Sequence, residues 1–291
     1  MTYMKEDYAI ITDSACDIPK HVLKEWNVQS IRMPFMFTDN NEERLDGDMP
    51  LNEFYNEMRS GRIVKTSGVN EFAFEDAFEK VLSKGKDILY IAFSSGLSVT
   101  YNNGRFVSDE LKEKYPDRKI YVVDSLSASA GEGLLVYKAF ANREKGISIE
   151  ENAKLLDDEK LSICHWFTVG DLLYLKRGGR ISAATAIIGG ALDIKPILHV
   201  DNDGHLIKMS QVRGRKKSIQ TLADKLKETI IDDDTPIFIS HGDCEEDAIA
   251  LKDIIKNYCG KEVKIITYIG SLIGAHSGPG TLALFFKGTN R

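Results

Sequence analysis

Several motifs that would assign this chain of 291 residues to a large enzyme class are absent from it. No Gly-x-x-x-x-Gly-Lys-Ser/Thr segment occurs, so the P-loop of nucleotide hydrolases is missing. No Gly-x-Gly-x-x-Gly follows the first predicted strand, and no Gly-x-Ser-x-Gly turn marks a hydrolase nucleophile. The six histidines lack metal-site spacing, so we expect no metal and no cofactor.

Cysteine is scarce, and basic residues are outnumbered by acidic ones. The four cysteines lie far apart, which is typical of reduced thiols in an intracellular protein. The net charge of −6 argues against general nucleic-acid binding, which usually requires a basic patch. No apolar run approaches the ~20 residues of a membrane-spanning helix, and the first residues carry mixed charges unlike a signal peptide. We therefore expect a soluble cytoplasmic protein that neither binds nucleic acid nor inserts stably into a membrane.

The first half of the chain alternates strand-like and helix-like segments. The predicted strands are residues 8–11, 31–37, 88–93 and 120–123. The predicted helices are residues 18–26, 51–59, 71–83, 99–115, 131–145 and 149–156. This alternation favours an α/β fold in which helices flank a mainly parallel sheet.

The second half predicts a second α/β domain with a mixed sheet. Asp-Asn-Asp-Gly at residues 201–204, between apolar runs, is a strong hairpin signal. Further strands are predicted at residues 164–169, 237–240, 264–268 and 283–286, and helices at 171–176, 183–194, 218–228 and 245–258. A charged break at residues 157–160 places the domain boundary near residues 155–161, which gives domains 1–156 and 157–291.

Small hydroxyl residues follow the predicted strands. Ser94 and Ser95 lie between a buried strand and a helix, where backbone N–H groups and the helix dipole favour an anion. Ligands of parallel α/β sheets bind beyond the carboxyl ends of the strands. Because these loops are poor in carboxylates and metal ligands, they indicate capture of a small anion. Plain helix capping by Ser98 is the structural alternative.

Thr66, Ser67 and His276 are further candidates for such a site. Thr66 and Ser67 precede the helix predicted at residues 71–83, and capping that helix would also explain them. His276 lies among glycines at positions 274, 278 and 280, which predicts a loop that approaches a ligand closely. A purely structural histidine is the alternative.

Two groups of basic residues stand out in this acidic chain. Arg177 and Arg180 flank two glycines that suit a helix C-terminus, and both arginines could simply be solvated or paired. The densest basic cluster comprises Arg213, Arg215, Lys216 and Lys217. This cluster indicates either a solvated face or a surface that attracts an acidic partner or a phosphate.

Seven short motifs in a fixed order give the chain a family resemblance. They are TDSACD (residues 12–17), TS (66–67), SSGLS (94–98), VDS (123–125), RGGRI (177–181), IKPIL (194–198) and GAH (274–276). Together they resemble the DegV family, whose better-characterised members act as the fatty-acid-binding subunit of bacterial fatty acid kinase. Val69 and Val99 depart from the family pattern, which often has proline and glycine there, and this affects the expected loop shape or acyl-chain preference.

The resemblance implies two α/β domains that enclose one long-chain fatty acid. It places the carboxylate near Thr66, Ser95 and His276, with Ser67 and Ser94 adjacent. It also implies a separate kinase catalytic subunit that phosphorylates the bound carboxylate to an acyl phosphate.

Other residues receive supporting roles on this interpretation. The small residues of segment 183–194, Ala184 and Gly190 among them, would leave room for the tail, with Arg177 and Arg180 in support. The basic cluster at residues 213–217 would steer the docking of the kinase subunit.

Two other functions stay open at this stage. One is a Ser/His hydrolase of a lipid-like ester, with Ser94 or Ser95 as nucleophile, His276 as base, and Asp13 or Asp124 orienting it. The missing nucleophile turn counts against that reading. The other is a carrier of a different amphipathic acid that has no kinase partner.

Overall fold

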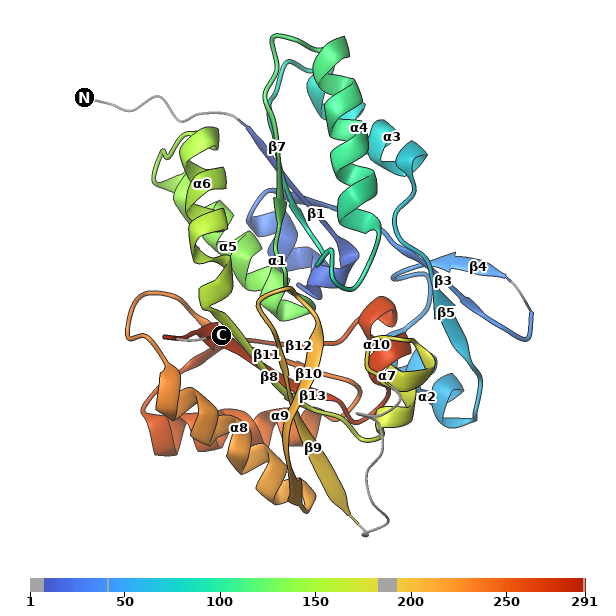
Figure 1. Ribbon diagram of the computed structural model, residues 1–291, viewed down its shortest axis with the longest axis vertical. Coiled ribbons are helices and arrows are strands. Elements are labelled where there is room, and N and C mark those ends of the chain that lie inside the picture. The colour runs from blue at the N-terminus through green and yellow to red at the C-terminus, as the bar shows by residue number, and fades with distance from the viewer. Residues whose placement is uncertain (1–7, 41, 183–192, 290) are drawn as a thin grey trace.

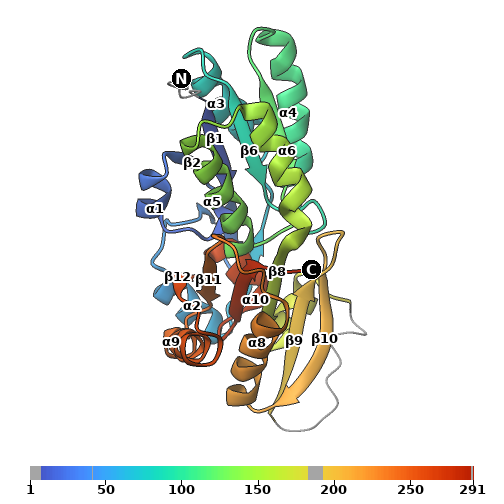
Figure 2. The ribbon, with the colours of Figure 1, turned by 90° about the vertical axis from the view of Figure 1, so that its left-hand side faces the viewer.

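The strands of the chain form three sheets in the computed structural model, which describes residues 8–40, 42–182, 193–289 and 291. Figures 1 and 2 show an elongated molecule in which one large sheet occupies each half, with a small third sheet beside the second. This arrangement confirms the predicted α/β class.

The first sheet is parallel throughout. Its spatial order is β2 (Val28–Ile31), β1 (Ala9–Asp13), β6 (Ile88–Ala92) and β7 (Ile120–Asp124). The accompanying helices are α1 (Lys20–Glu25), α3 (Glu71–Leu82), α4 (Thr100–Lys114), α5 (Ala130–Glu144) and α6 (Ile149–Glu159). Four of these helices contact β6, and every residue of that central strand is buried. The predicted parallel sheet with flanking helices is therefore confirmed.

The second sheet is mixed. Its spatial order is β10 (Leu206–Arg213), β9 (Ile194–Val200), β8 (Ile163–Thr168), β13 (Leu282–Lys287), β11 (Ile237–His241) and β12 (Val263–Tyr268). The helices of this half are α7 (Leu172–Arg177), α8 (Arg215–Thr229), α9 (Glu245–Ile254) and α10 (Ser271–Ser277). Short helical turns cover Ser14–Cys16, Lys160–Ser162 and Ile255–Cys259. Strands β9 and β10 pair antiparallel, which confirms the predicted hairpin.

The strand predicted at residues 31–37 is wrong, because the chain changes sheets there. β2 ends at Ile31, and β3 (Pro34–Phe37) joins the small sheet with β4 (Glu43–Leu45) and β5 (Val64–Thr66). At the break, the backbone N–H of Met33 donates to the Ser14 hydroxyl (3.0 Å) instead of to a strand. Pro34 has no N–H to continue the ladder of the first sheet.

The small sheet packs against the second half of the chain. Helix α2 (Leu51–Arg59) and strands β3 and β5 contact α10. The Tyr55 hydroxyl donates to the carbonyl of Ile269 at 2.9 Å. No described sheet takes strands from both sides of residue 156, yet residues 34–66 are tied to the carboxyl-terminal half. The division into domains 1–156 and 157–291 stays a prediction.

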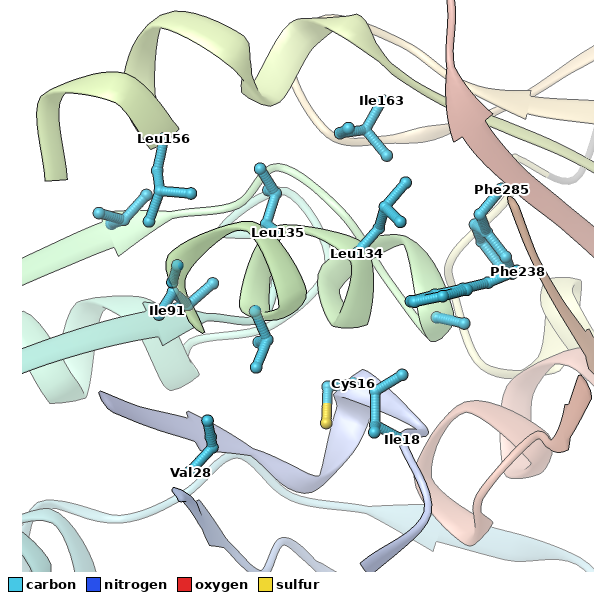
Figure 3. Close-up of a cluster of buried hydrophobic side chains, with 14 of the residues drawn as sticks. Cys16, Ile18, Val28, Ile91, Leu134, Leu135, Leu156, Ile163, Phe238 and Phe285 are labelled. Carbon is cyan, nitrogen blue, oxygen red and sulfur yellow. The ribbon is translucent and has the colours of Figure 1, made fainter. Parts of the chain in front are cut away.

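Helix α5 joins the two large sheets through one apolar core. Figure 3 shows Leu134 and Leu135 of α5 between Ile91 of the first sheet and Phe238 and Phe285 of the second. Full burial of each such side chain stabilises the fold by roughly 1.5–3 kcal/mol. The two halves therefore share a core.

Three carboxyl groups are buried where β1 meets α5. Asp13 accepts hydrogen bonds from the Tyr90 hydroxyl (2.9 Å) and the backbone N–H of Phe93 (3.0 Å), which fixes the loop after β6. Burial raises the pKa of Asp13 to about 6, although these hydrogen bonds lower it. Burial also raises the pKa of Asp17 and Glu132 well above their ordinary values. The Glu132 carboxyl accepts from Thr12, while its second oxygen has no partner among the described residues.

Glu132→Gln tests whether this burial makes stability depend on pH. A carboxyl whose pKa is raised on folding contributes stability that is fully present below its unfolded value of 4.5 and is lost as the pH rises through the folded value. The glutamine variant should therefore gain stability relative to wild type between pH 5 and pH 8. Urea unfolding at both pH values measures this. Glu110→Gln, on an exposed position of α4, is the control. A Glu132→Gln difference that is the same at both pH values would contradict the account.

Candidate functional site

A cavity of about 270 Å³ lies between the two large sheets. Its wall comes from the loop after β6, from β8, β13 and α10, and from the adjoining ends of β9 and β10. The wall is mainly apolar, with Phe93, Leu97, Phe167, Leu206, Leu272 and Phe285 among its residues. An apolar cavity of this kind suits an apolar ligand, and the few polar groups on its wall determine how that ligand is oriented.

Polar side chains gather at the open end of the cavity. The Thr66 hydroxyl and His276 Nε2 are hydrogen bonded at 2.7 Å, although 210 positions separate them in sequence. Ser67, Ser98 and Arg180 also line this region. Val99 marks the mouth, because it lines the cavity while 59% of its surface is exposed. We call Thr66, Ser67, Ser98, Arg180 and His276 the mouth cluster.

His276 lies in helix α10 and not in the flexible loop that its neighbouring glycines predicted. Gly274 lies inside the same helix, where a Cβ would come within 2.5 Å of the Tyr55 hydroxyl oxygen. Gly178 packs against the histidine, since a Cβ there would come within 2.1 Å of Nδ1. Gly178 therefore permits close packing against the imidazole, and Gly274 permits close packing of α10 against Tyr55.

The His276 imidazole is neutral at physiological pH. Burial, together with the nearby positive charge of Arg180, lowers its pKa to about 4. Its Nδ1 is buried and has no partner among the described residues. Arg180 is half-buried and fixed by backbone carbonyls, with Nε 3.1 Å from the oxygen of Leu97. The mouth cluster therefore offers neutral donors and one guanidinium to a single acidic group.

Ser94 and Ser95 do not line the cavity. Ser94 is buried, and its hydroxyl donates to the carbonyl of Gly204 at 3.0 Å. Ser95 is exposed, and its backbone N–H donates to Asp124 at 3.1 Å. Ser98 of the same loop lines the cavity and also accepts from the backbone N–H of Thr100 at 3.2 Å. The hydroxyl-rich loop therefore contributes Ser98 to the cavity wall, and the geometry of the turn directs Ser94 and Ser95 elsewhere.

Of the two arginines predicted to support the site, one lines the cavity and the other does not. Arg180 lines the cavity, whereas Arg177 is exposed and lies over the Tyr174 ring at 5.6 Å. Ala184 and Gly190, together with residues 183–192 as a whole, lie outside the described residues.

The basic cluster at residues 213–217 lies away from the cavity. Arg213 is seven residues beyond the cavity residue Leu206 on β10, which is ~23 Å at about 3.3 Å per residue. Arg215 is paired with Asp247 at 2.9 Å. A role of this cluster in docking stays a prediction from the sequence.

Neither a metal-ligand cluster nor a membrane-spanning helix occurs in residues 8–40, 42–182, 193–289 and 291. Within those ranges, no group of three His, Cys, Asp or Glu side chains is arranged to hold a metal ion. None of the described helices combines the length and the apolar character needed to cross a bilayer.

Comparison with known proteins gives one consistent result. The family model described as "Uncharacterised protein, DegV family COG1307" matches residues 7–288. The "DegV domain-containing protein CPE0026" of Clostridium perfringens is 43% identical, over 98% of each chain. The "DegV domain-containing protein YteA" of Lactococcus lactis is 34% identical over 96% of each chain.

Solved structures share the fold over nearly the whole chain. A "degv lipid binding protein (tm1468)" from Thermotoga maritima is 30% identical with a TM-score of 0.84, covering 98% of this chain and 99% of that one. "DegV, a fatty acid binding protein from Bacillus subtilis" is 28% identical with a TM-score of 0.81, covering 96% and 98%.

The pKa of His276 is directly measurable. An NMR titration of the imidazole, assigned by comparison with His276→Asn, should show protonation near pH 4. Arg180→Gln should raise that pKa, because a positive charge is removed, yet leave it below 6.5, because burial is the larger cause. A wild-type pKa near 6.5 would show that the imidazole is solvated and that the site is not built as described.

Proposed function

The chain belongs to the DegV family, and on that premise we propose that it binds one long-chain fatty acid in the cytoplasm. The tail would fill the apolar cavity, and the carboxylate would lie at the mouth cluster. The observation that carries this proposal is the Thr66–His276 hydrogen bond at the mouth of an apolar cavity. It is supported by the relatives from Thermotoga maritima and Bacillus subtilis that are described as lipid-binding or fatty-acid-binding.

The cavity wall accounts for affinity toward the tail. A palmitate-sized chain buries about fifteen methylene and methyl groups at ~0.8 kcal/mol each, of order 12 kcal/mol before the costs of association. The carboxylate needs hydrogen-bond donors, because a buried and unpaired charge is very costly. Thr66, Ser98 and His276 supply them from three separate segments.

We further propose that the bound carboxylate is presented to a separate kinase subunit, which transfers the terminal phosphoryl group of ATP to a carboxylate oxygen. Hydroxyl and neutral imidazole donors hold the carboxylate while leaving its oxygens more nucleophilic than a tight bidentate ion pair would. The mouth is accessible, since Ser67 and Val99 are exposed.

The arrangement gives little support to the hydrolase alternative. The hydroxyl that contacts His276 belongs to Thr66, and Nδ1 of the ring has no carboxylate partner among the described residues. Asp124, one candidate orienting carboxylate, accepts from the backbone of Ser95 and Leu126. A Ser–His–Asp relay is therefore not assembled at the mouth.

Substitutions at the mouth should separate binding residues from their neighbours. Thr66→Val and His276→Ala each remove a donor to a charged group, which costs ~1.5–3 kcal/mol, or roughly ten- to a hundredfold in fatty-acid affinity. Ser95→Ala is the matched control, because it removes an exposed hydroxyl from the adjacent loop. Affinities for palmitate come from titration of delipidated protein. Equal affinity of all four proteins would overturn the site, and a loss confined to Ser95→Ala would move it.

Presentation to a kinase needs its own assay. With a fatty acid kinase catalytic subunit and ATP, the lipid-loaded protein should yield acyl phosphate, trapped as the hydroxamate by hydroxylamine. His276→Ala loaded at saturating lipid should yield less, because the carboxylate is no longer positioned. Lipid binding without acyl phosphate would leave a carrier that has no kinase partner. Covalent labelling of a serine by a fluorophosphonate would favour the hydrolase instead.

A further inference from the structure

A buried histidine lies on the wall of the cavity, far from the mouth cluster. His165 is 1% exposed and belongs to β8. It lines the cavity beside Phe285, whose ring meets the imidazole edge-on with 5.5 Å between centroids. Neither ring nitrogen has a hydrogen-bond partner of ordinary geometry among the described residues, although the backbone of Ile163 lies near enough to raise the pKa of the imidazole. A polar side chain that is buried and unpaired needs an explanation, because most such groups are satisfied in folded proteins.

The sheet register places His165 at the deep end of the cavity. Thr281 lies next to α10, since its hydroxyl donates to the carbonyl of Ser277 at 2.9 Å. From Thr281, β13 runs to Phe285, which pairs directly with His165. Both Thr281 and Phe285 line the cavity, and four residues of strand separate them, or roughly 13 Å. An acyl tail that enters from the mouth therefore reaches His165 well beyond its carboxylate.

The fold makes room for this imidazole. Gly131, at the start of α5, faces it, and a Cβ there would come within 2.2 Å of His165 Nε2. His199 Nδ1 donates to the backbone carbonyl of His165 at 2.8 Å, which holds β8 beside β9. The ring is thus tightly confined by glycine, phenylalanine and its own strand.

The imidazole is neutral and able to bind a hydroxyl group. Burial holds the pKa of His165 well below its ordinary value, and the positive charge of Arg291 lowers it further. A neutral imidazole has one N–H donor and one acceptor nitrogen. A hydroxyl group can pair with either of them, because its oxygen both donates and accepts hydrogen bonds. A plain methylene chain satisfies neither nitrogen, so it leaves the cost of burying the imidazole in place.

We infer that this cavity is selective for a fatty acid that carries a hydroxyl group on its tail, with His165 hydrogen bonded to that oxygen. The inference rests on the proposed fatty-acid binding and adds the chemical class of the ligand. It assigns His165 as a specificity-determining residue at the end of the cavity opposite Thr66 and His276.

The test compares palmitic acid with monohydroxypalmitic acids that differ in the position of the hydroxyl group. Affinities are measured for wild type and for His165→Phe and His165→Leu, two apolar replacements of different size. One positional isomer should bind wild type at least threefold more tightly than palmitic acid does. Both variants should lose that preference, so that the favoured isomer binds them no more tightly than palmitic acid does.

The outcomes separate this inference from the function it rests on. Tight binding of palmitic acid with no preferred isomer would overturn the role of His165 and leave fatty-acid binding intact. If a folded His165 variant keeps the preference for one isomer, that preference comes from another residue, and the role of His165 is also overturned. Absence of binding by every acid would contradict the proposed function itself. If both variants fail to fold, the isomer series on wild type decides.

Discussion

The hydrogen bond between Thr66 and His276 is the contact on which the rest of the site depends. It joins the end of β5, in the small sheet, to α10 in the carboxyl-terminal half. It forms because the Tyr55 hydroxyl is bonded to Ile269 and because Gly178 and Gly274 let their neighbours approach closely. One hydrogen-bonded pair is thereby set at the edge of an apolar cavity, where the proposed carboxylate would lie.

The two halves of the molecule are held together by both apolar and polar contacts. Helix α5 buries leucines against both large sheets, as Figure 3 shows. Asp17 adds a polar connection, since it accepts from the Ser129 hydroxyl at the start of α5 and from the backbone N–H of Gly270 at 2.8 Å. Gly270 immediately precedes α10, so the helix that carries His276 is anchored to the first half. A cavity between the sheets keeps its shape only if those connections are rigid.

Much of the fold was predictable because its signals are local. Strand–helix alternation identified the parallel sheet, and the Asp-Asn-Asp-Gly turn identified the β9–β10 hairpin. The change of sheet between Ile31 and Pro34 was missed, because apolar residues run through both strands and tertiary packing decides the break. The small sheet was also missed, because β4 and β5 are only three residues long and so leave little pattern in the sequence.

Sequence patterns indicated which types of residue occur near the cavity, but not which individual side chains line it. Thr66 and His276, which the family resemblance assigned to one carboxylate site, are hydrogen bonded to each other, and the helix around His276 packs against Tyr55. Ser98 lines the cavity in place of Ser94 and Ser95, which depends on the turn. Nothing local distinguishes His165 from an ordinary core histidine; only the sheet register turns it toward the cavity.

A crystal structure of the protein with bound palmitate tests the central claim most directly. The account predicts the carboxylate within hydrogen-bond distance of the Thr66 hydroxyl and the His276 imidazole, with the tail running along β13 toward Phe285. A carboxylate at the His165 end, or a lipid outside the cavity between the sheets, would contradict it.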